Sequence, residues 1–307
     1  MKWLKNILTQ RYGNIRFRLM DINCMGYYGL IGLLLIFFHR TVNNWQLHIL
    51  IHIGIIVAIL EIARVYAKYP HNKTLKFVRI FYPISLILYG WREIDVLARM
   101  IYGNFWSTDH IIHLEKLIFG VYPTIWFQQF FCPWRDELMN FFYDSYYLFM
   151  PIVSLTLFFK RKDEAAIAAF SLITAVLFSN FILFYLFPTL GPHDKFVEWK
   201  TLSYTGYIFG EITRTIQANG SIRGGAIPSS HVSAALAWAL IALRYERKLG
   251  YFLLPMSLGV GIATVYLGYH YALDPICGYI WCLIVYPIVL KLIKKRGEEP
   301  LEIPSTQ

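Results

Sequence analysis

Eight apolar stretches divide this chain of 307 residues, and each is a candidate for a helix that crosses a lipid bilayer. Such a helix needs about 17–25 mostly apolar residues. Arg79 and Pro83 interrupt the third stretch, and the sixth is short and contains Ser and His. No soluble domain fits between them, so the pattern predicts an all-α polytopic membrane protein with about eight transmembrane helices. The stretches cover residues 22–39, 47–66, 77–91, 140–159, 165–187, 227–243, 250–268 and 272–290.

The composition supports this interpretation. Hydrophobic residues make up 57% of the chain, charged residues make up 16%, and the mean hydropathy is +0.45. Soluble domains are roughly 45–50% apolar and about 25% charged. These values argue against a soluble Rossmann enzyme, a nucleic-acid-binding module and a disordered chain.

The basic residues cluster in alternate connections between the apolar stretches. Five such connections hold 20 of the 29 Lys and Arg residues. Because cytoplasmic loops are enriched in Lys and Arg, we expect both termini in the cytoplasm. The formal net charge of +10 then faces the anionic inner leaflet and not nucleic acid. The clusters are Lys2 to Arg18, Arg64 to Arg79, Lys160 to Lys162, Arg244 to Lys248 and Lys291 to Arg296.

Three connections fall on the opposite, outer face: residues 92–139, 188–226 and 264–274. Within the first, residues 112–131 are apolar and aromatic but are broken by Gly120 and Pro123. This stretch predicts an interfacial or re-entrant helical element and not a span. A functional site is expected at the outer face, because all three connections converge there.

The first chemical motif is Pro228-Ser229-Ser230-His231, which follows two glycines and opens the sixth stretch. Pro and Ser favour the first positions of a helix, where free N–H groups and a partial positive charge bind phosphate. A histidine there can hydrogen-bond the same anion or protonate a leaving oxygen. Taken alone, the motif fits an ordinary helix cap equally well.

The second motif places His270 four residues before Asp274. An Asp that is bonded to one imidazole nitrogen fixes the tautomer and leaves the other nitrogen free as a nucleophile. Pro275 disfavours helical angles at Asp274, so Asp274 is expected to cap the eighth helix, with His270 in the preceding turn. Together with His231, these residues form a set suited to phosphoryl transfer.

The two motifs resemble those of the type 2 phosphatidic acid phosphatase (PAP2) superfamily, which also includes the vanadium haloperoxidases. Pro228 to His231 is similar to the family's PSGH motif, with Ser230 in place of Gly, and Val265 to Gly278 is similar to its third motif. The resemblance covers roughly residues 105–290.

One branch of this family, the inositol phosphorylceramide synthases, is similar in further details. The family's third motif begins with Ser-Arg, whereas this chain has Ala263-Thr264, as that branch does. Phe187 to Pro192 resembles the first motif of the branch, and Glu115 to Pro123 resembles its upstream pattern.

The resemblance implies a PAP2- and haloperoxidase-like helical core and a role for each motif residue. His270 would be the nucleophile that forms a phosphohistidine, and Asp274 would orient it. His231 would protonate the leaving group and then activate the acceptor. Ser229 and the backbone amides of Ser230 and His231 would hold phosphate oxygens.

The missing motif arginine raises the question of which group supplies the positive charge that a transferring phosphoryl group needs. Arg223, just before the two glycines, is the first candidate, and Lys195 and His193 follow. Each of them also fits a solvated loop charge. No residues have metal-ligand spacing, and this chemistry needs no metal or other cofactor if side chains and helix amides supply the charge.

The remaining histidines have simpler interpretations. His48 and His52 lie four residues apart in the second stretch and are expected to hydrogen-bond within the bundle. His110 and His113 flank the interfacial element and are weak candidates for contact with a lipid head group.

The sequence thus predicts N-terminal membrane helices over 1–104, a PAP2-like catalytic membrane domain over 105–290 and a cytoplasmic tail over 291–307. The expected function is cleavage or transfer of a lipid phosphate ester at the extracytoplasmic or lumenal face of a plasma, inner or endomembrane. Hydrolysis and transfer of a phospho-head-group to a lipid acceptor are both open. A non-catalytic lipid-binding or transport protein is the alternative of another class. The expected partners are the lipid substrate and the bilayer, without nucleic acid.

Overall fold

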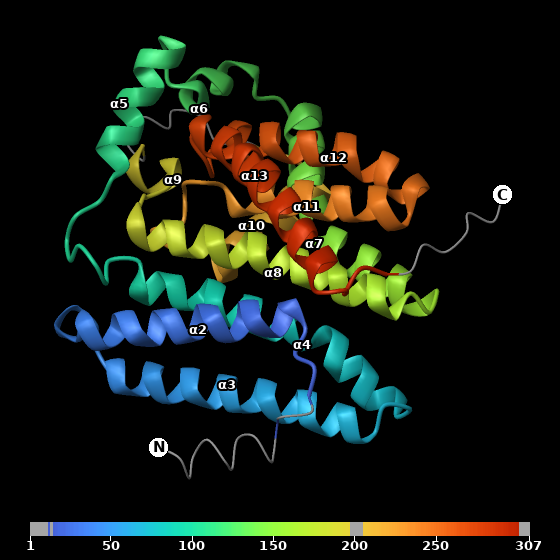
Figure 1. Cartoon of the computed structure of the whole chain (residues 1–307). Helices are drawn as coiled ribbons and strands as arrows, with labels where there is room; N and C mark the ends of the chain where they lie inside the picture. Colours follow the sequence, from blue (N-terminus) through green and yellow to red (C-terminus); the bar gives the residue numbers. More distant parts are fainter. Residues whose placement is uncertain (1–11, 13–14, 197–204, 301–307) are drawn as a thin grey trace.

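The computed structural model describes residues 12, 15–196 and 205–300, and this part of the chain is all helical (Figure 1). In chain order the elements are α2 (Leu19–Phe37), η1 (His39–Thr41), α3 (Trp45–Lys68), α4 (Lys73–Leu97), α5 (Thr108–Phe119), α6 (Pro123–Trp126), η2 (Phe127–Phe130), α7 (Pro133–Phe159), α8 (Asp163–Leu186), α9 (Pro192–Lys195), α10 (Ile208–Gly220), α11 (Ser230–Tyr245), α12 (Arg247–Tyr266) and α13 (Leu273–Lys295).

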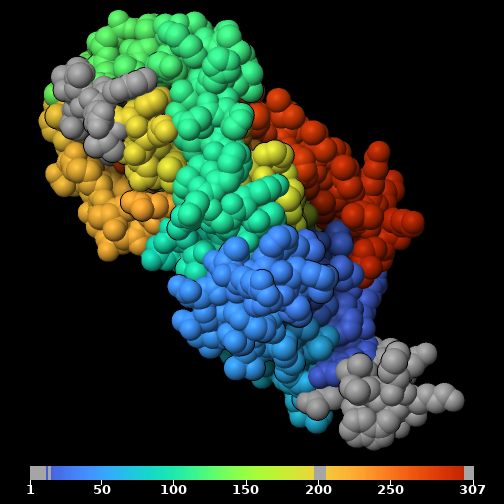
Figure 2. Space-filling view, turned by 90° about the vertical axis from the view of Figure 1, so that its left-hand side faces the viewer, coloured from blue at the N-terminus to red at the C-terminus, as the bar shows by residue number. Residues whose placement is uncertain are grey.

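Helix α8 lies at the centre of the bundle. It packs against α2 and α4 on one side and against α7, α11 and α13 on the other (Figure 1). Most of its side chains are buried in one apolar core that it shares with these neighbours. Small residues such as Ala165, Ala168 and Ala169 allow the neighbouring backbones to approach closely. Figure 2 shows α2 and α3 as one lobe of the molecule and the later helices as another.

All eight apolar stretches form helices, but the expected count of about eight spans is not confirmed. Within the described residues, six helices are long and apolar enough to cross a bilayer: α2, α3, α7, α8, α12 and α13. Helix α11 has only 16 residues, and α4 carries Lys, Arg, Glu and Asp side chains. The six spans support an integral membrane protein, in which α4 and α11 pack among the longer helices.

A buried ion pair explains how α4 tolerates a charge inside the bundle. The two terminal guanidinium nitrogens of Arg79 donate to the carboxylate of Asp21 on α2, at 2.6 and 2.5 Å. The Tyr82 hydroxyl donates to the same carboxylate. A bidentate pair with further hydrogen bonds offsets much of the cost of removing two charges from water. The Arg79–Asp21 ion pair therefore links α4 to α2.

The basic clusters and the outer connections lie at opposite ends of the bundle. At the basic end, ion pairs join Lys76 to Asp163 at 2.6 Å and Lys160 to Glu246 at 2.6 Å. At the other end lie the start of α11 and the turn between α12 and α13. Lys2, Lys5 and Arg11 of the first cluster, and tail residues 301–307, lie outside the described residues.

Two smaller expectations are confirmed: residues 112–131 form helical elements and not a span, and His48 and His52 hydrogen-bond within the bundle. Residues 112–131 form parts of α5, α6 and η2, and none of these elements is long enough to span a bilayer. His48 and His52 both contact the carboxylate of Glu93 on α4, at 2.7 and 2.9 Å. The two histidines therefore hydrogen-bond within the bundle, as their spacing predicted.

Candidate active site

Segments that are far apart in the sequence meet at the end of the bundle opposite the basic clusters. Thr189 forms a short parallel bridge with Gly225, and the Ala226 N–H donates to the Thr189 carbonyl at 3.3 Å. The hydroxyl oxygens of Ser107 and Thr189 lie 2.7 Å apart. Residues 187–192 are thereby held beside the loop that leads into α11.

The helix start at the first motif is held against α13. Helix α11 begins at Ser230, with Ser229 as its extended N-cap residue. The Ser229 N–H donates to the Asp274 carbonyl at 2.9 Å. A Cβ added to Gly278 would lie 2.6 Å from the Ser229 carbonyl oxygen, so the two helices approach to a distance that only glycine permits.

His270 lies in the turn between α12 and α13. Gly268 adopts a φ of +79°, which favours glycine, and the His270 N–H donates to the Thr264 carbonyl at 3.0 Å. Asp274 lies in the first turn of α13, and one carboxylate oxygen is 3.1 Å from His270 Nδ1. The Tyr271 N–H donates to the same oxygen at 2.9 Å. His270 precedes the helix, as predicted, but the expectation that Asp274 caps it is wrong: the N-cap is Ala272, and Asp274 is the second residue of α13. Pro275 does not prevent this, because a proline is tolerated in the first turn of a helix.

The two motif histidines face each other. His270 Nε2 lies 3.5 Å from His231 Nδ1 and 3.1 Å from Ser229 Oγ. Burial lowers the pKa of His270 to about 4, against an opposing hydrogen bond with the Ala226 backbone, so this imidazole is neutral at pH 7. Because Nδ1 is paired with the Asp274 carboxylate, the lone pair is on Nε2. A neutral imidazole with its lone pair beside an acid/base group is what nucleophilic attack requires.

A small pocket of about 40 Å³ opens beside the two histidines. That volume holds about three water-sized atoms, which suits a phosphoryl group and not a lipid chain. Its walls include Trp91 of α4, Tyr143 of α7 and Gln217 of α10. Sequence reasoning missed these three residues, because they belong to no motif and come from helices that only packing brings together.

Among the three candidate cations, His193 alone lines this pocket. The Arg223 side chain is 73% exposed, and its backbone N–H donates to Asp95 at 2.8 Å, which holds the residue at the surface near the end of α4. Lys195 pairs with Asp109 of α5 at 2.7 Å. The expectation that Arg223 or Lys195 lies beside the histidines is therefore not supported by where these residues are placed.

The weaker lipid-contact candidates lie away from the pocket. His110 and His113 are exposed on α5 and are not part of the pocket wall. Within the described residues, no group of three or more His, Cys, Asp or Glu side chains is arranged to hold a metal ion.

Glu115 of α5 contacts the turn that carries His270. Its side chain is fully buried, and one carboxylate oxygen accepts the N–H of Ala272. Burial raises the pKa of Glu115 to about 7; the Ala272 hydrogen bond opposes this rise and the charge of Asp274 adds to it. The upstream similarity at Glu115 thus corresponds to a contact with the turn that carries His270.

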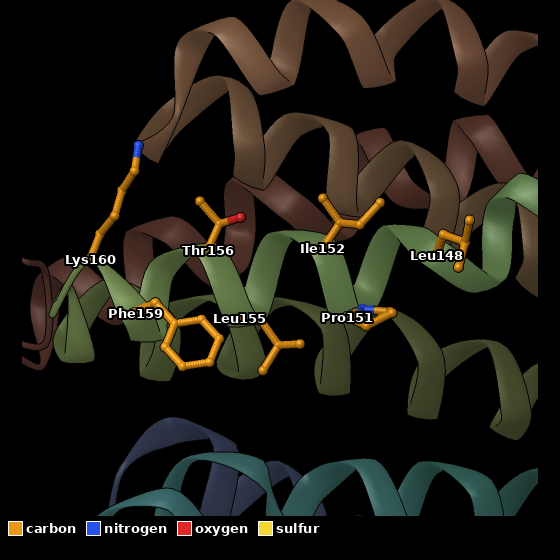
Figure 3. Close-up of a pocket in the computed structure, with 7 residues that line it drawn as sticks. All are labelled: Leu148, Pro151, Ile152, Leu155, Thr156, Phe159 and Lys160. Carbon is orange, nitrogen blue, oxygen red and sulfur yellow. The ribbon is translucent and has the colours of Figure 1, made fainter.

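An apolar groove of about 500 Å³ runs along α7 (Figure 3). Seven residues between Leu148 and Lys160 line it, and Thr156 and Lys160 are the two polar ones. The groove begins one residue after Tyr147, and the neighbouring Tyr146 ring lies 5.0 Å from the His231 ring, centroid to centroid. It therefore starts next to the two motif histidines and leads away from them along the bundle.

The comparisons with known proteins agree with this geometry. A family model described as the PAP2 superfamily matches residues 109–288, which is more than half of the chain and includes both histidine motifs. The searches of curated proteins and of solved structures gave no match. The inositol phosphorylceramide synthase-like branch is thus not confirmed. The chain belongs to the PAP2 superfamily.

Proposed function

We propose that this protein is a membrane phosphatase or phosphotransferase that acts on the phosphate ester of a lipid through a phosphohistidine at His270. The contact set of His270 carries the proposal. Its Nδ1 lies 3.1 Å from the Asp274 carboxylate, and its Nε2 lies 3.1 Å from Ser229 Oγ and 3.5 Å from His231. Nucleophile, orienting carboxylate and acid/base partner are thus in contact before substrate binds.

The reaction has two steps. Burial and the neighbouring His270 lower the pKa of His231 to about 3, so this imidazole is neutral in the free enzyme, and the bound phosphate anion favours its protonated form. His270 Nε2 then attacks phosphorus, the P–N bond forms as the bond to the leaving oxygen breaks, and protonated His231 gives its Nδ1 proton to that oxygen. A water or alcohol molecule then gives its proton to His231 and attacks the phosphohistidine, which restores free His270. The charge on the phosphoryl oxygens is met by the amides at the start of α11, the Ser229 hydroxyl and His193.

The groove along α7 supports a lipid as the substrate. Leu148 to Phe159 extend over roughly 17 Å of helix, about half of the hydrocarbon core, which is the depth of one leaflet. The pocket at the histidines is too small for an acyl chain. We therefore place the phosphate in the pocket and an acyl chain in the groove.

The proposal is tested with purified protein and a panel of ³²P-labelled lipid phosphates and phospholipids, assayed with and without added alcohol acceptors. The wild type should release or transfer the labelled phosphate, and an acid-labile, alkali-stable phosphoenzyme should accumulate on brief incubation. If the label is found only in inorganic phosphate, the reaction is hydrolysis. If it is found in a lipid product, the head group has been transferred to a lipid acceptor, as in the inositol phosphorylceramide synthase-like branch.

Variants assign the roles. His270→Ala should lose turnover by about 10⁴-fold or more and form no phosphoenzyme, and His231→Ala should be severely impaired. His113→Ala, on the exposed face of α5, is the matched control and should keep full activity. A folded His270→Ala protein with normal activity would overturn the mechanism.

A further inference from the structure

His231 has a second polar neighbour besides His270. Its Nε2 lies 3.5 Å from the hydroxyl oxygen of Tyr143, and the two rings pack with their centroids 5.6 Å apart. The side-chain amide of Gln217 donates to the same hydroxyl oxygen. The Tyr147 ring, one turn further along α7, lies 6.2 Å from the Tyr143 ring, centroid to centroid. The mechanism above uses none of these three side chains.

The packing of α10 on α7 holds this group in place. The carboxylate of Glu137, near the start of α7, accepts backbone N–H groups at the start of α10, at 2.6 to 3.3 Å. One turn before Gln217, the Thr213 hydroxyl donates to Asp144 at 3.0 Å. These contacts fix the register of the two helices and so place Gln217 against Tyr143, which is 1% exposed.

The chemistry of a proton shuttle determines which way the hydrogen bonds must run. The Nδ1 of His231 faces His270, so this nitrogen gives the proton to the leaving group and later takes one from the acceptor. After that donation the imidazole is neutral, and its remaining hydrogen must be on Nε2. Tyr143 can accept that hydrogen, because a phenol oxygen has two acceptor lone pairs and the Gln217 amide uses only one of them.

We infer that Tyr143 is a positioning residue for His231 and that Gln217 positions Tyr143. The phenol oxygen holds the Nε2–H tautomer and so keeps Nδ1 as the nitrogen that transfers protons. Tyr143 thus does for His231 what Asp274 does for His270, with a neutral acceptor in place of a carboxylate. The kinetic part of this inference rests on the proposed phosphoryl transfer, whereas the tautomer does not.

The kinetic test compares two substrates with different leaving groups. One is a long-chain alkyl phosphate, whose alkoxide must be protonated as it leaves. The other is a nitrophenyl phosphate with an alkyl chain of the same length, whose leaving group needs no proton. Tyr143→Phe should lower kcat/KM for the alkyl phosphate by roughly 10- to 100-fold and leave that for the nitrophenyl ester nearly unchanged, because only the first reaction uses the acid.

Two further variants separate positioning from a structural role. Gln217→Leu should show the same selectivity between the substrates, and adding it to Tyr143→Phe should cause little further loss, since both act through one chain of contacts. Tyr146→Phe is the matched control, because its ring also packs on His231, at 5.0 Å. It should show no selectivity. Equal losses of Tyr143→Phe on both substrates, or no loss, would overturn the inference.

A measurement without substrate keeps the inference falsifiable if both phosphates prove inert. In protein labelled with ¹⁵N-histidine, the nitrogen chemical shifts of His231, assigned with His231→Ala, should show Nε2 protonated in the wild type. Tyr143→Phe should give a mixture of the two tautomers, and Tyr146→Phe should not. A wild type with the proton on Nδ1 would overturn the tautomer assignment. Inactive wild-type protein with the Nε2–H tautomer would refute the proposed function and leave this assignment standing.

Discussion

Glu115 keeps a proton up to about pH 7, because it is buried beside Asp274. The unfolded chain releases this proton near the ordinary pKa of 4.5. Between these pH values the folded protein binds more protons than the unfolded one, so this group's contribution to stability falls as pH rises from about 4.5 to 7.

Glu115→Gln should remove this loss of folding stability at high pH, because an amide oxygen can still accept the Ala272 N–H and carries no charge. The variant should unfold at a higher temperature than the wild type at pH 8 and at a similar one at pH 5. At pH 8 the free energy of unfolding of the variant should exceed that of the wild type by at most about 3 kcal/mol. Thermal unfolding in detergent over this pH range measures it, and a variant that is less stable at pH 8 would contradict the assignment.

The positions of His193 and Arg223 predict unequal roles in phosphate binding. His193 lines the pocket, and its replacement by Ala should cost about 10²-fold in kcat/KM at pH 7, the typical effect of losing one donor to a developing oxyanion. Arg223→Ala should stay close to wild type, because its side chain is 73% exposed. Lys195→Ala is the charge-matched control. The reverse order of effects would make Arg223 the cationic clamp after all.

Helix α7 combines three tasks along its length. In its first turns, Glu137 accepts backbone N–H groups at the start of α10. In the next turns, Tyr143 and Tyr146 contact His231. The second half of the helix lines the apolar groove. Because helical residues four apart share a face, one continuous stripe of α7 joins the two motif histidines to the groove.

Filling the groove should therefore affect long-chain substrates alone. Leu148→Trp should lower kcat/KM for a long-chain lipid phosphate by roughly tenfold or more, because a small misplacement of the reacting group is costly. A short-chain, water-soluble phosphate should be cleaved at the wild-type rate. Leu258→Trp on α12 is the matched control, since Leu148 and Leu258 are 57% and 54% exposed. Equal effects of the two variants would exclude the groove as the acyl site.

The assembled bundle has its basic clusters at one end and its histidines at the other, which predicts how it lies in the membrane. If Lys and Arg face the cytoplasm, the active site faces outward or into a lumen. In a cysteine-free background, a Cys at Asn104 should react with a membrane-impermeant thiol reagent added to intact cells, and a Cys at Arg247 should not. Both positions are exposed. Labelling at 247 alone would place the site in the cytoplasm.

The amino-acid sequence alone located the helices and the chemical motifs of this protein. Long apolar stretches form helices wherever they occur, because the backbone groups of a membrane segment must be paired within it. Alternate loops reach the same end of a bundle, so His231 and His270 could be placed together without a structure. The close HxxxD spacing likewise located Asp274 beside His270.

Only the tertiary structure decided which other side chains surround these histidines. Tyr143, Gln217 and Trp91 come from three separate helices, and Arg223 lies within eight residues of His231 yet remains at the surface. Distances between side chains on different helices depend on rotation and register, which small residues and buried ion pairs set through packing. Rotation and register cannot be deduced from spacing along the chain, so the pocket wall and the surface position of Arg223 became visible only in three dimensions.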